Sequence, residues 1–179
     1  MNLILKDRKK IYDGIVFNVY RDECEYNSGN KTIREVIQHN GGSVIVPICQ
    51  NGDLILIKQF RYPLQKEMIE LPAGKLFKNE IPIECAKREL EEETGFISEN
   101  ISHLTTIQTT PGFCDEELHI FLAQNVSSSK NGRQLEEGEE GMQIFQTSFK
   151  EATKMIMENK ITDGKTICGI LIAKEFLKL

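Results

Sequence analysis

Four glutamates crowd the end of one predicted helix, in the segment KRELEEETGF at residues 87–96. Glu89, Glu92 and Glu93 stand at i, i+3 and i+4 and share one helix face, whereas Glu91 points away from them. Like charges at this spacing repel, and the negative end of the helix dipole adds to the cost. One interpretation is a solvated acidic face. The other is a bound cation that offsets the repulsion.

Three carboxylates without a nearby His or Cys form an all-oxygen site, which suits Mg²⁺ or Mn²⁺ better than zinc. Mg²⁺ is usually held by a few carboxylates while substrate phosphates and waters complete its shell. The cation interpretation therefore predicts a phosphate-bearing substrate.

The helix that carries these glutamates is predicted over residues 82–94. Pro82 suits its first turn, Gly95 suits the position just past its end, and apolar residues recur between them at helical spacing. Two more helices are predicted, one from the capping box Ser148-x-x-Glu151 and one that begins near residues 163–166.

Strands are predicted on both sides of the first helix. Asn51-Gly52 is a strong hairpin signal between β-rich runs at 43–49 and 54–60, and further strands fit at 103–109, 118–124 and 142–147. Strands interleaved with three helices predict an α/β protein with helices on both faces of a mixed sheet. Residues 1–40 read as a few strands that cannot bury themselves alone. We therefore expect a small N-terminal β appendage and a main domain at 41–179.

Composition excludes several classes of partner. The net charge is −5 and no Lys/Arg cluster forms a basic face, so neither nucleic acid nor an anionic membrane is an expected partner. The five cysteines are scattered without CxxC spacing, which argues against a disulfide framework or a zinc site. The apolar runs are too short to span a membrane. We expect a cytoplasmic protein.

A longer pattern surrounds the glutamates: Gly74, five residues, Glu80, seven residues, then Arg88-Glu89-Leu90-x-Glu92-Glu93-x-Gly95-Phe96. It resembles the Nudix box, a 23-residue signature of hydrolases that act on a nucleoside diphosphate linked to another moiety. Each fixed polar and glycine position is filled, and Phe96 replaces the usual aliphatic residue. The resemblance implies a Nudix-type α/β/α sandwich with a mixed sheet.

The resemblance also implies roles for the residues of the box. Glu89, Glu92 and Glu93 would bind metal together with the backbone carbonyl of Ala73, and Glu80 would be structural. From the residues alone, Gly74 suits a tight loop before the helix. We also expect Arg88 to pair with Glu80 or Glu92 and to hold the acidic array in position.

Residues outside the box bear on the substrate. QFRYP at 59–63, MIELPAGKL at 68–76 and the proline of TTPGFCDEELHIF, 15 residues after Phe96, are similar to ADP-ribose pyrophosphatases of this family. The guanidinium of Arg61 matches phosphate oxygens, although a salt bridge with Glu67 or Glu70 is the alternative. For Pro111-Gly112-Phe113, here called the PGF segment, the alternative is an ordinary turn. For the acidic residues that follow it, the alternative is a solvated loop. The predicted substrate-binding residues are Arg61, Glu70, Pro111, Gly112, Phe113 and Asp115.

Cleaving a pyrophosphate also needs a base near the attacking water. In similar enzymes a glutamate on a loop after the box takes this role. The segment QLEEGEEGM at 134–142 offers Glu136, Glu137, Glu139 and Glu140 with two glycines. Glu139 or Glu140 is our candidate. A solvated acidic loop remains an alternative, as does activation of the water by the box glutamates alone.

The sequence thus predicts a Mg²⁺-dependent pyrophosphatase, with Mn²⁺ as a possible substitute, that splits ADP-ribose into AMP and ribose 5-phosphate. The alternatives are another nucleotide sugar such as GDP-mannose, or a non-catalytic module that binds ADP-ribose. The resemblance also implies a homodimer whose N-terminal strands help to line the partner's base pocket. The chain has no tryptophan to stack on a base, so Phe17, Tyr20 or Tyr26 would have to substitute.

Overall fold

The computed structural model describes residues 3–135 and 137–179. The chain divides into two compact units by its contacts. The first unit comprises residues 1–41 and 108–117, and the main unit comprises residues 42–107 and 118–179. The sequence-based division at residue 41 assigns residues 108–117 to the main domain. In the structure, the contacts of residues 108–117 group them with the N-terminal strands.

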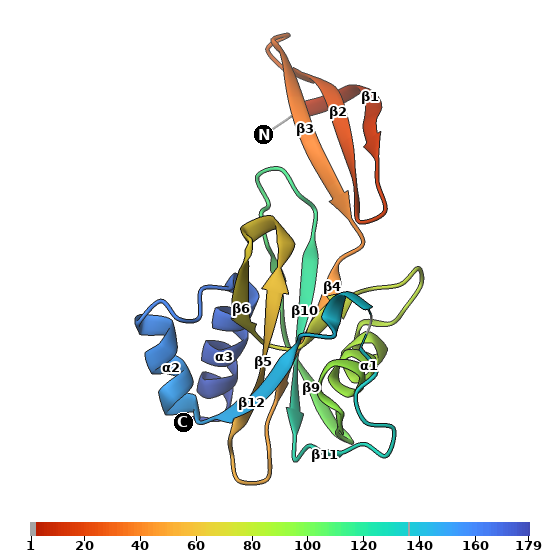
Figure 1. The fold of residues 1–179 in the computed structure, drawn as a ribbon. Helices are drawn as coiled ribbons and strands as arrows, with labels where there is room; N and C mark the ends of the chain where they lie inside the picture. Colours follow the sequence, from red (N-terminus) through yellow and green to blue (C-terminus); the bar gives the residue numbers. More distant parts are fainter. Residues whose placement is uncertain (1–2, 136) are drawn as a thin grey trace. The chain divides into compact units, whose positions relative to one another are not determined.

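The first unit is built on a three-stranded antiparallel sheet, β1 (Leu3–Asp13), β2 (Phe17–Tyr26) and β3 (Lys31–His39), in that order (Figure 1). The backbone N–H of Ile37 in β3 donates to the carbonyl of Phe113 at 2.7 Å, and the N–H of Asp115 donates to the carbonyl of Ile37 at 3.1 Å. These bonds fasten residues 108–117 to β3 as an additional extended segment.

The main unit contains two larger sheets and a two-stranded ribbon. One sheet has the order β7 (Ala73–Lys75), β4 (Gly42–Pro47), β10 (Glu117–Gln124), β9 (Asn100–Gln108); β10 runs parallel and β7 antiparallel to β4. The second has the order β12 (Gln143–Thr147), β5 (Leu54–Arg61), β6 (Lys66–Glu70), with both pairs antiparallel. The ribbon pairs β8 (Phe96–Ile97) with β11 (Ser127–Ser128), and 3₁₀ turns span η1 (Tyr62–Leu64) and η2 (Glu137–Glu139).

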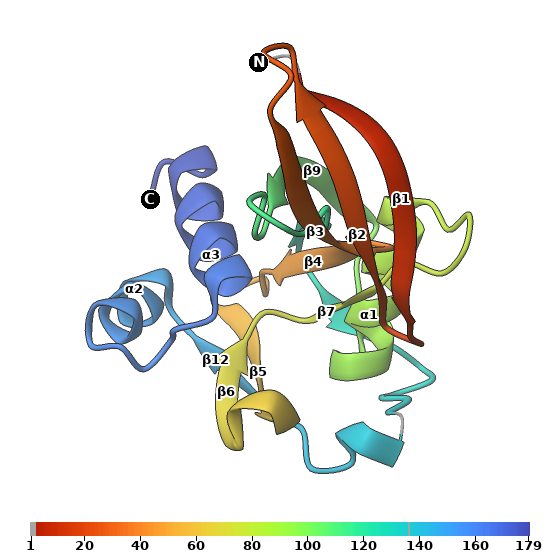
Figure 2. The ribbon, with the colours of Figure 1, turned by 90° about the horizontal axis from the view of Figure 1, so that it is seen from above.

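Helices cover both faces of the main unit, as the sequence predicts. Figure 2 shows β4 between α1 (Pro82–Thr94) and α3 (Gly164–Phe176), with α2 (Phe149–Met157) beside α3. The buried strand β4 alternates between two cores: Val44 and Val46 pack in the α2–α3 core, and Ile45 packs with Leu90 of α1. Within the described part of the chain, no helix is both long and apolar enough to cross a membrane.

The turn predicted at Asn51-Gly52 is present, but the hairpin around it is limited to one antiparallel bridge. Gly52 has φ of +87° and donates its N–H to the carbonyl of Cys49 at 3.0 Å. A bridge between Ile48 and Leu54 follows, and the chain then passes from one sheet to the other. The edges of β4 are already hydrogen-bonded to β7 and β10, so β5 pairs with β6 and β12 instead.

Candidate active site

Helix α1 presents the acidic residues, and its bounds are those predicted from the sequence. It begins at Pro82, whose carbonyl accepts a 2.7 Å hydrogen bond from Ser43 Oγ of β4. It ends at Thr94 and is capped by Gly95, which has φ of +73° and donates its N–H to the carbonyl of Glu91 at 2.8 Å. The positive φ explains the glycine at this position, because other residues rarely adopt it without strain.

Glu89 lies against the backbone of Gly74. A Cβ at position 74 would be 1.7 Å from Oε1 of Glu89 and 2.0 Å from its carboxyl carbon. Gly74 is part of strand β7, so the tight loop predicted for it from the sequence is wrong. The glycine is needed here because a carboxylate occupies the space where a side chain would begin.

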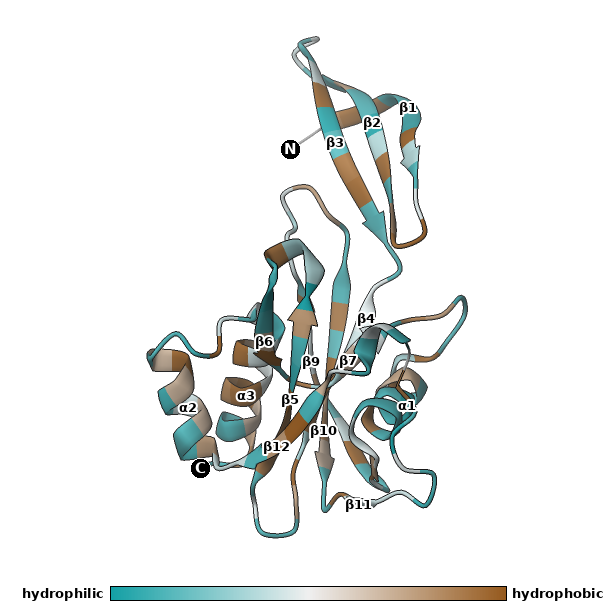
Figure 3. Cartoon of the chain, in the orientation of Figure 1, coloured by the Kyte–Doolittle hydropathy of each residue, from teal (hydrophilic) through white to brown (hydrophobic). Residues whose placement is uncertain are grey.

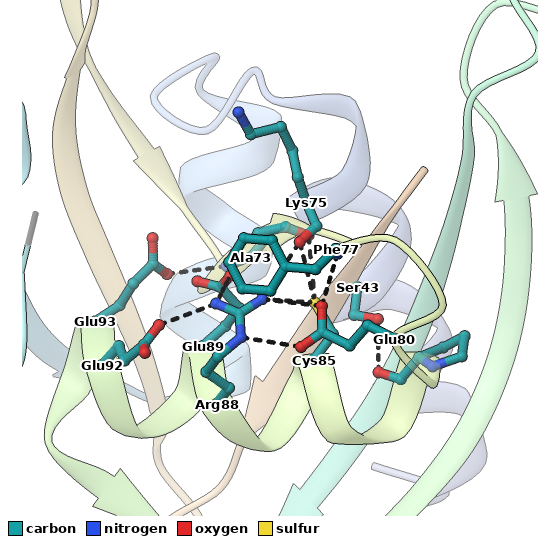
Figure 4. Close-up of polar contacts among 12 residues, drawn as sticks. Ser43, Ala73, Lys75, Phe77, Glu80, Cys85, Arg88, Glu89, Glu92 and Glu93 are labelled. Atoms are coloured by element: carbon teal, nitrogen blue, oxygen red, sulfur yellow. Dashed lines mark hydrogen bonds and ion pairs between the residues drawn. The ribbon is translucent and has the colours of Figure 1, made fainter. Parts of the chain in front are cut away.

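Arg88 connects three carboxylates (Figure 4). Its Nε donates to Glu80 at 3.0 Å, and its Nη1 donates to Glu89 at 2.6 Å and to Glu92 at 2.9 Å. The pairing with Glu80 and Glu92 is the one predicted from the sequence. The ring of Phe77 lies under the guanidinium, with 4.4 Å between its centroid and Cζ of Arg88. Arg88 therefore offsets part of the negative charge of the array.

Glu93 completes the array and is 98% buried. Its Oε2 accepts the backbone N–H of Ala73 at 2.9 Å. Burial raises the pKa of Glu93 well above its ordinary value, and the nearby charge of Glu89 raises it further. Burial likewise raises the pKa of Glu89 to about 7, despite the opposing effect of Arg88. Two carboxylates whose charged forms are this unfavourable gain stability from an added cation.

The donors at this site suit a hard divalent cation. Glu93 bonds to the backbone of Ala73, Glu89 lies against Gly74, and Arg88 joins Glu92 to Glu89. All of these groups offer oxygen atoms. Among the residues that the structure describes, no three His, Cys, Asp or Glu side chains converge closely enough to hold an ion as placed. Arg88 draws Glu92 and Glu89 toward itself, and Glu93 turns to the N–H of Ala73. Binding an ion would require the carboxylates to rotate out of these bonds.

The candidate base segment lies near the same carboxylates. Glu139 ends η2, and its negative charge contributes to the raised pKa of both Glu89 and Glu93. Glu140 is exposed. Glu136, which the sequence also offers, lies outside the described residues. The role of Glu139 or Glu140 as a base stays a prediction.

Arg61 forms a two-point salt bridge with Glu70, the alternative to phosphate binding that the sequence leaves open. Its Nε and Nη2 donate to the Glu70 carboxylate at 2.8 and 2.6 Å. Lys165 of α3 also donates to Glu70 and, at 2.9 Å, to Asp163. Burial alone would raise the pKa of Glu70, but the bond from Arg61 and the charge of Lys165 bring it below its ordinary value.

The start of α3 also supports the segment before β7. Asp163 caps the helix by accepting the N–H of Thr166 at 3.0 Å, as expected of a helix start. In addition, the buried Oγ1 of Thr166 accepts the backbone N–H of Leu71 at 2.8 Å. Sequence reasoning missed this second contact, since nothing in the local pattern links residues 95 positions apart.

The PGF segment belongs to the first unit. Phe113 is 52% exposed, and its N–H donates to the carbonyl of Thr110 at 3.1 Å, so Pro111 and Gly112 lie in a turn. Asp115 is exposed, and one of its oxygens accepts the backbone N–H of His39 at 2.8 Å. The contact of Asp115 with β3 is structural, and its contact with substrate stays a prediction.

Comparison with known proteins identifies the family. The NUDIX domain model matches residues 39–164. An ADP-ribose pyrophosphatase of Bacillus subtilis is 36% identical over 163 residues, covering 91% of this chain and 88% of that protein. A methanol dehydrogenase activator of Bacillus methanolicus is 36% identical over 171 residues, covering 96% and 90%. A GDP-mannose pyrophosphatase of Yersinia enterocolitica is 34% identical over 142 residues, covering 75% and 74%.

The fold is also found among solved structures. A crystal structure of an ADP compounds hydrolase superposes with a TM-score of 0.87, covering 99% of this chain and 95% of that one. The sequence identity is 19%, so this likeness supports the fold alone. It agrees with the mixed sheet and the three helices predicted from the sequence.

Proposed function

The chain belongs to the NUDIX family, and we propose that it is a Mg²⁺-dependent pyrophosphatase that hydrolyses ADP-ribose to AMP and ribose 5-phosphate. The observation that carries this proposal is the buried acidic array. Glu89 and Glu93 lie against β7 at the positions that the family signature assigns to metal binding, in a chain 36% identical to an ADP-ribose pyrophosphatase.

A divalent ion held by Glu89, Glu92, Glu93 and the carbonyl of Ala73 would neutralise phosphate charge and lower the pKa of the attacking water. The protein supplies the rest. Arg88 keeps the carboxylates of Glu89 and Glu92 close together before the ion arrives. These carboxylates would then turn from Arg88 toward the ion.

Glu139 is the proposed general base. Its carboxylate takes a proton from the attacking water as the water oxygen bonds to phosphorus. The bond between that phosphorus and the bridging oxygen breaks, and the proton passes to the leaving phosphate. The proximity of the Glu139 charge to Glu89 and Glu93 supports this role.

A substrate panel tests the proposal. The purified chain would be incubated with ADP-ribose, GDP-mannose and ADP-glucose, with Mg²⁺, with Mn²⁺ or with EDTA, and products would be separated by ion-exchange chromatography. We expect AMP and ribose 5-phosphate from ADP-ribose, and no product with EDTA. Faster turnover of GDP-mannose would favour the nucleotide-sugar alternative. Tight binding of ADP-ribose without turnover would favour the non-catalytic module.

A second candidate comes from the methanol dehydrogenase activator, which matches a larger share of this chain than the ADP-ribose pyrophosphatase does. An action on a dehydrogenase would be seen by adding the chain to a methanol dehydrogenase assay with Mg²⁺. An increased rate that the Glu93→Gln variant does not produce would connect the two activities through one site.

We also propose that the first unit mediates a cytoplasmic homodimer. Figure 3 shows hydrophobic bands alternating with hydrophilic ones along β2 and β3. Large apolar side chains of this unit are exposed, which is typical of interaction surfaces. They are Ile4, Leu5, Ile11, Tyr12, Ile15, Val16, Phe17 and Ile33. Light scattering should give twice the chain mass of 20.4 kDa, and Ile11→Glu should lower it. A monomeric wild type would contradict the proposal.

A further inference from the structure

Residues 129–134, here called the strap, cap the end of α1 that carries the acidic array. The backbone N–H of Gln134 donates to the carbonyl of Glu92 at 2.9 Å, and the N–H of Ser129 donates to the carbonyl of Gly95 at 2.7 Å. Between them, Nε of Arg133 donates to the carbonyl of Glu93 at 2.8 Å. The last carbonyls of a helix have no partner within it, so the strap satisfies groups that α1 leaves open.

Glu91, the glutamate that points away from the array, holds the strap. Its carboxylate accepts hydrogen bonds from Ser129 Oγ and, at 2.8 Å, from Asn131 Nδ2. These two bonds lower the pKa of Glu91. The four clustered glutamates thus divide into three that face the array and one that fastens the strap to the same helix.

Arg133 reaches beyond the strap to the segment that bears Glu139. While its Nε bonds to Glu93, its Nη2 donates to the carbonyl of Met142 at 2.9 Å. The N–H of the buried Met142 donates in turn to the carbonyl of Glu139 at 2.8 Å. A continuous path of hydrogen bonds therefore runs from Glu93 through Arg133 and Met142 to Glu139.

The local packing keeps Arg133 in place. A Cβ on Gly95 would be 3.2 Å from Cγ of Arg133, so the glycine lets the side chain lie close to the helix end. The guanidinium also places a positive charge at the C-terminal end of α1, where the helix dipole favours a cation. No basic residue of the last turn of α1 itself supplies that charge.

We propose that Arg133 is a positioning residue that fixes Glu139 relative to Glu93 and the rest of the acidic array. The inference rests on the proposed function, in which Glu139 accepts the proton of the attacking water. The planar guanidinium spans the carbonyl of Glu93 in α1 and the carbonyl of Met142, just before β12. A lysine would keep the charge but lacks the rigid fork that makes both bonds.

Kinetics of three variants separate this role from simple stabilisation. Arg133→Met should lower kcat by about 10- to 100-fold with little change in KM, since small displacements of a catalytic group are costly. Arg133→Lys should lose most of the rate as well. The control is Lys130→Met, which removes an exposed cation from the same strap and should leave kcat unchanged.

A double variant tests whether Arg133 acts through Glu139. Once Glu139→Gln has removed the base, adding Arg133→Met should cost less than about twofold more, because coupled residues are not additive. Independent, multiplying losses would overturn the proposal. Full activity of Arg133→Lys or of Glu139→Gln would overturn it too.

Hydrogen exchange provides a readout that needs no turnover. Amides in residues 137–147 should exchange faster in Arg133→Met than in the wild type, and Lys130→Met should match the wild type. Unchanged exchange in Arg133→Met would overturn the proposed bridge. If the wild type hydrolyses no nucleotide substrate, the proposed function fails, and hydrogen exchange still decides whether Arg133 holds the segment.

Discussion

The carboxylate of Glu89 occupies the space in which a side chain at Gly74 would begin, with 1.7 Å between Oε1 and a Cβ built on the glycine. This contact joins the strand that precedes α1 to the acidic face of that helix. The clash in Gly74→Ala would fall on the end of a flexible side chain, so Glu89 would move while the backbone stays in place. The acidic array depends on this one missing Cβ.

Gly74→Ala should therefore fold but lose activity. We expect kcat to fall by about 100-fold, as for other small displacements of catalytic groups, with a melting temperature close to that of the wild type. Metal-dependent turnover and circular dichroism melts would measure the two effects. Gly164→Ala in the first turn of α3 is the matched control, because a Cβ there meets nothing within 4 Å. Equal activity of Gly74→Ala and the wild type would contradict the placement of Glu89.

Glu70 should make the stability of the protein depend on pH. Its pKa is lowered in the folded state by Arg61 and Lys165, which outweigh the effect of burial. A carboxyl group whose pKa is lowered by folding stabilises the protein at pH values above its pKa in the unfolded chain, about 4.3. That stability is lost as the pH falls through the pKa of the folded state. Urea unfolding of the metal-free protein from about pH 7 to pH 3 should show a steeper loss for the wild type than for Glu70→Gln.

Glu67→Gln is the control for this measurement, since Glu67 pairs with Lys58 at an exposed position. Its unfolding free energy should follow the wild-type pH dependence. Parallel curves for the wild type and Glu70→Gln would show that Glu70 has no shifted pKa in the fold.

Thr166→Val should destabilise the main unit. The buried Oγ1 of Thr166 accepts the N–H of Leu71, and valine would leave that N–H without its acceptor. The expected cost is about 1–3 kcal/mol in the free energy of unfolding, measured by urea titration. Thr153→Val is the comparison, because Thr153 Oγ1 bonds within its own helix α2, to the carbonyl of Phe149. A similar, small effect of both substitutions would count against the link from α3 to Leu71.

Much of the candidate site can be predicted from the sequence because it lies on one helix. Helical periodicity decides which of Glu89, Glu91 and Glu93 share a face, and Pro82 and Gly95 mark both helix ends. The pairing of Arg88 with Glu92 is also local, at i, i+4. These features need only the geometry of a single element.

The remaining features depend on residues far apart in the chain. Arg133 meets the carbonyl of Glu93 across 40 positions, and Lys165 meets Glu70 across 95. The turn at Gly52 can be predicted from the sequence. Which sheet each flanking strand joins depends on which strand edges are free to form hydrogen bonds. Local propensity carries no information on such pairings, so the strap and the support from α3 emerge only in the folded structure.

The central claim is that the acidic face of α1 carries out metal-dependent cleavage of ADP-ribose. The most direct test compares kcat for Glu93→Gln and Glu84→Gln, with Mg²⁺ and with Mn²⁺. Both substitutions remove one glutamate charge from α1, but Glu84 is exposed in its first turn. We predict that Glu93→Gln loses about 100- to 1,000-fold, the range seen when electrostatic stabilisation of a transition state is removed, while Glu84→Gln keeps the wild-type rate. Equal rates for the two variants would contradict the account.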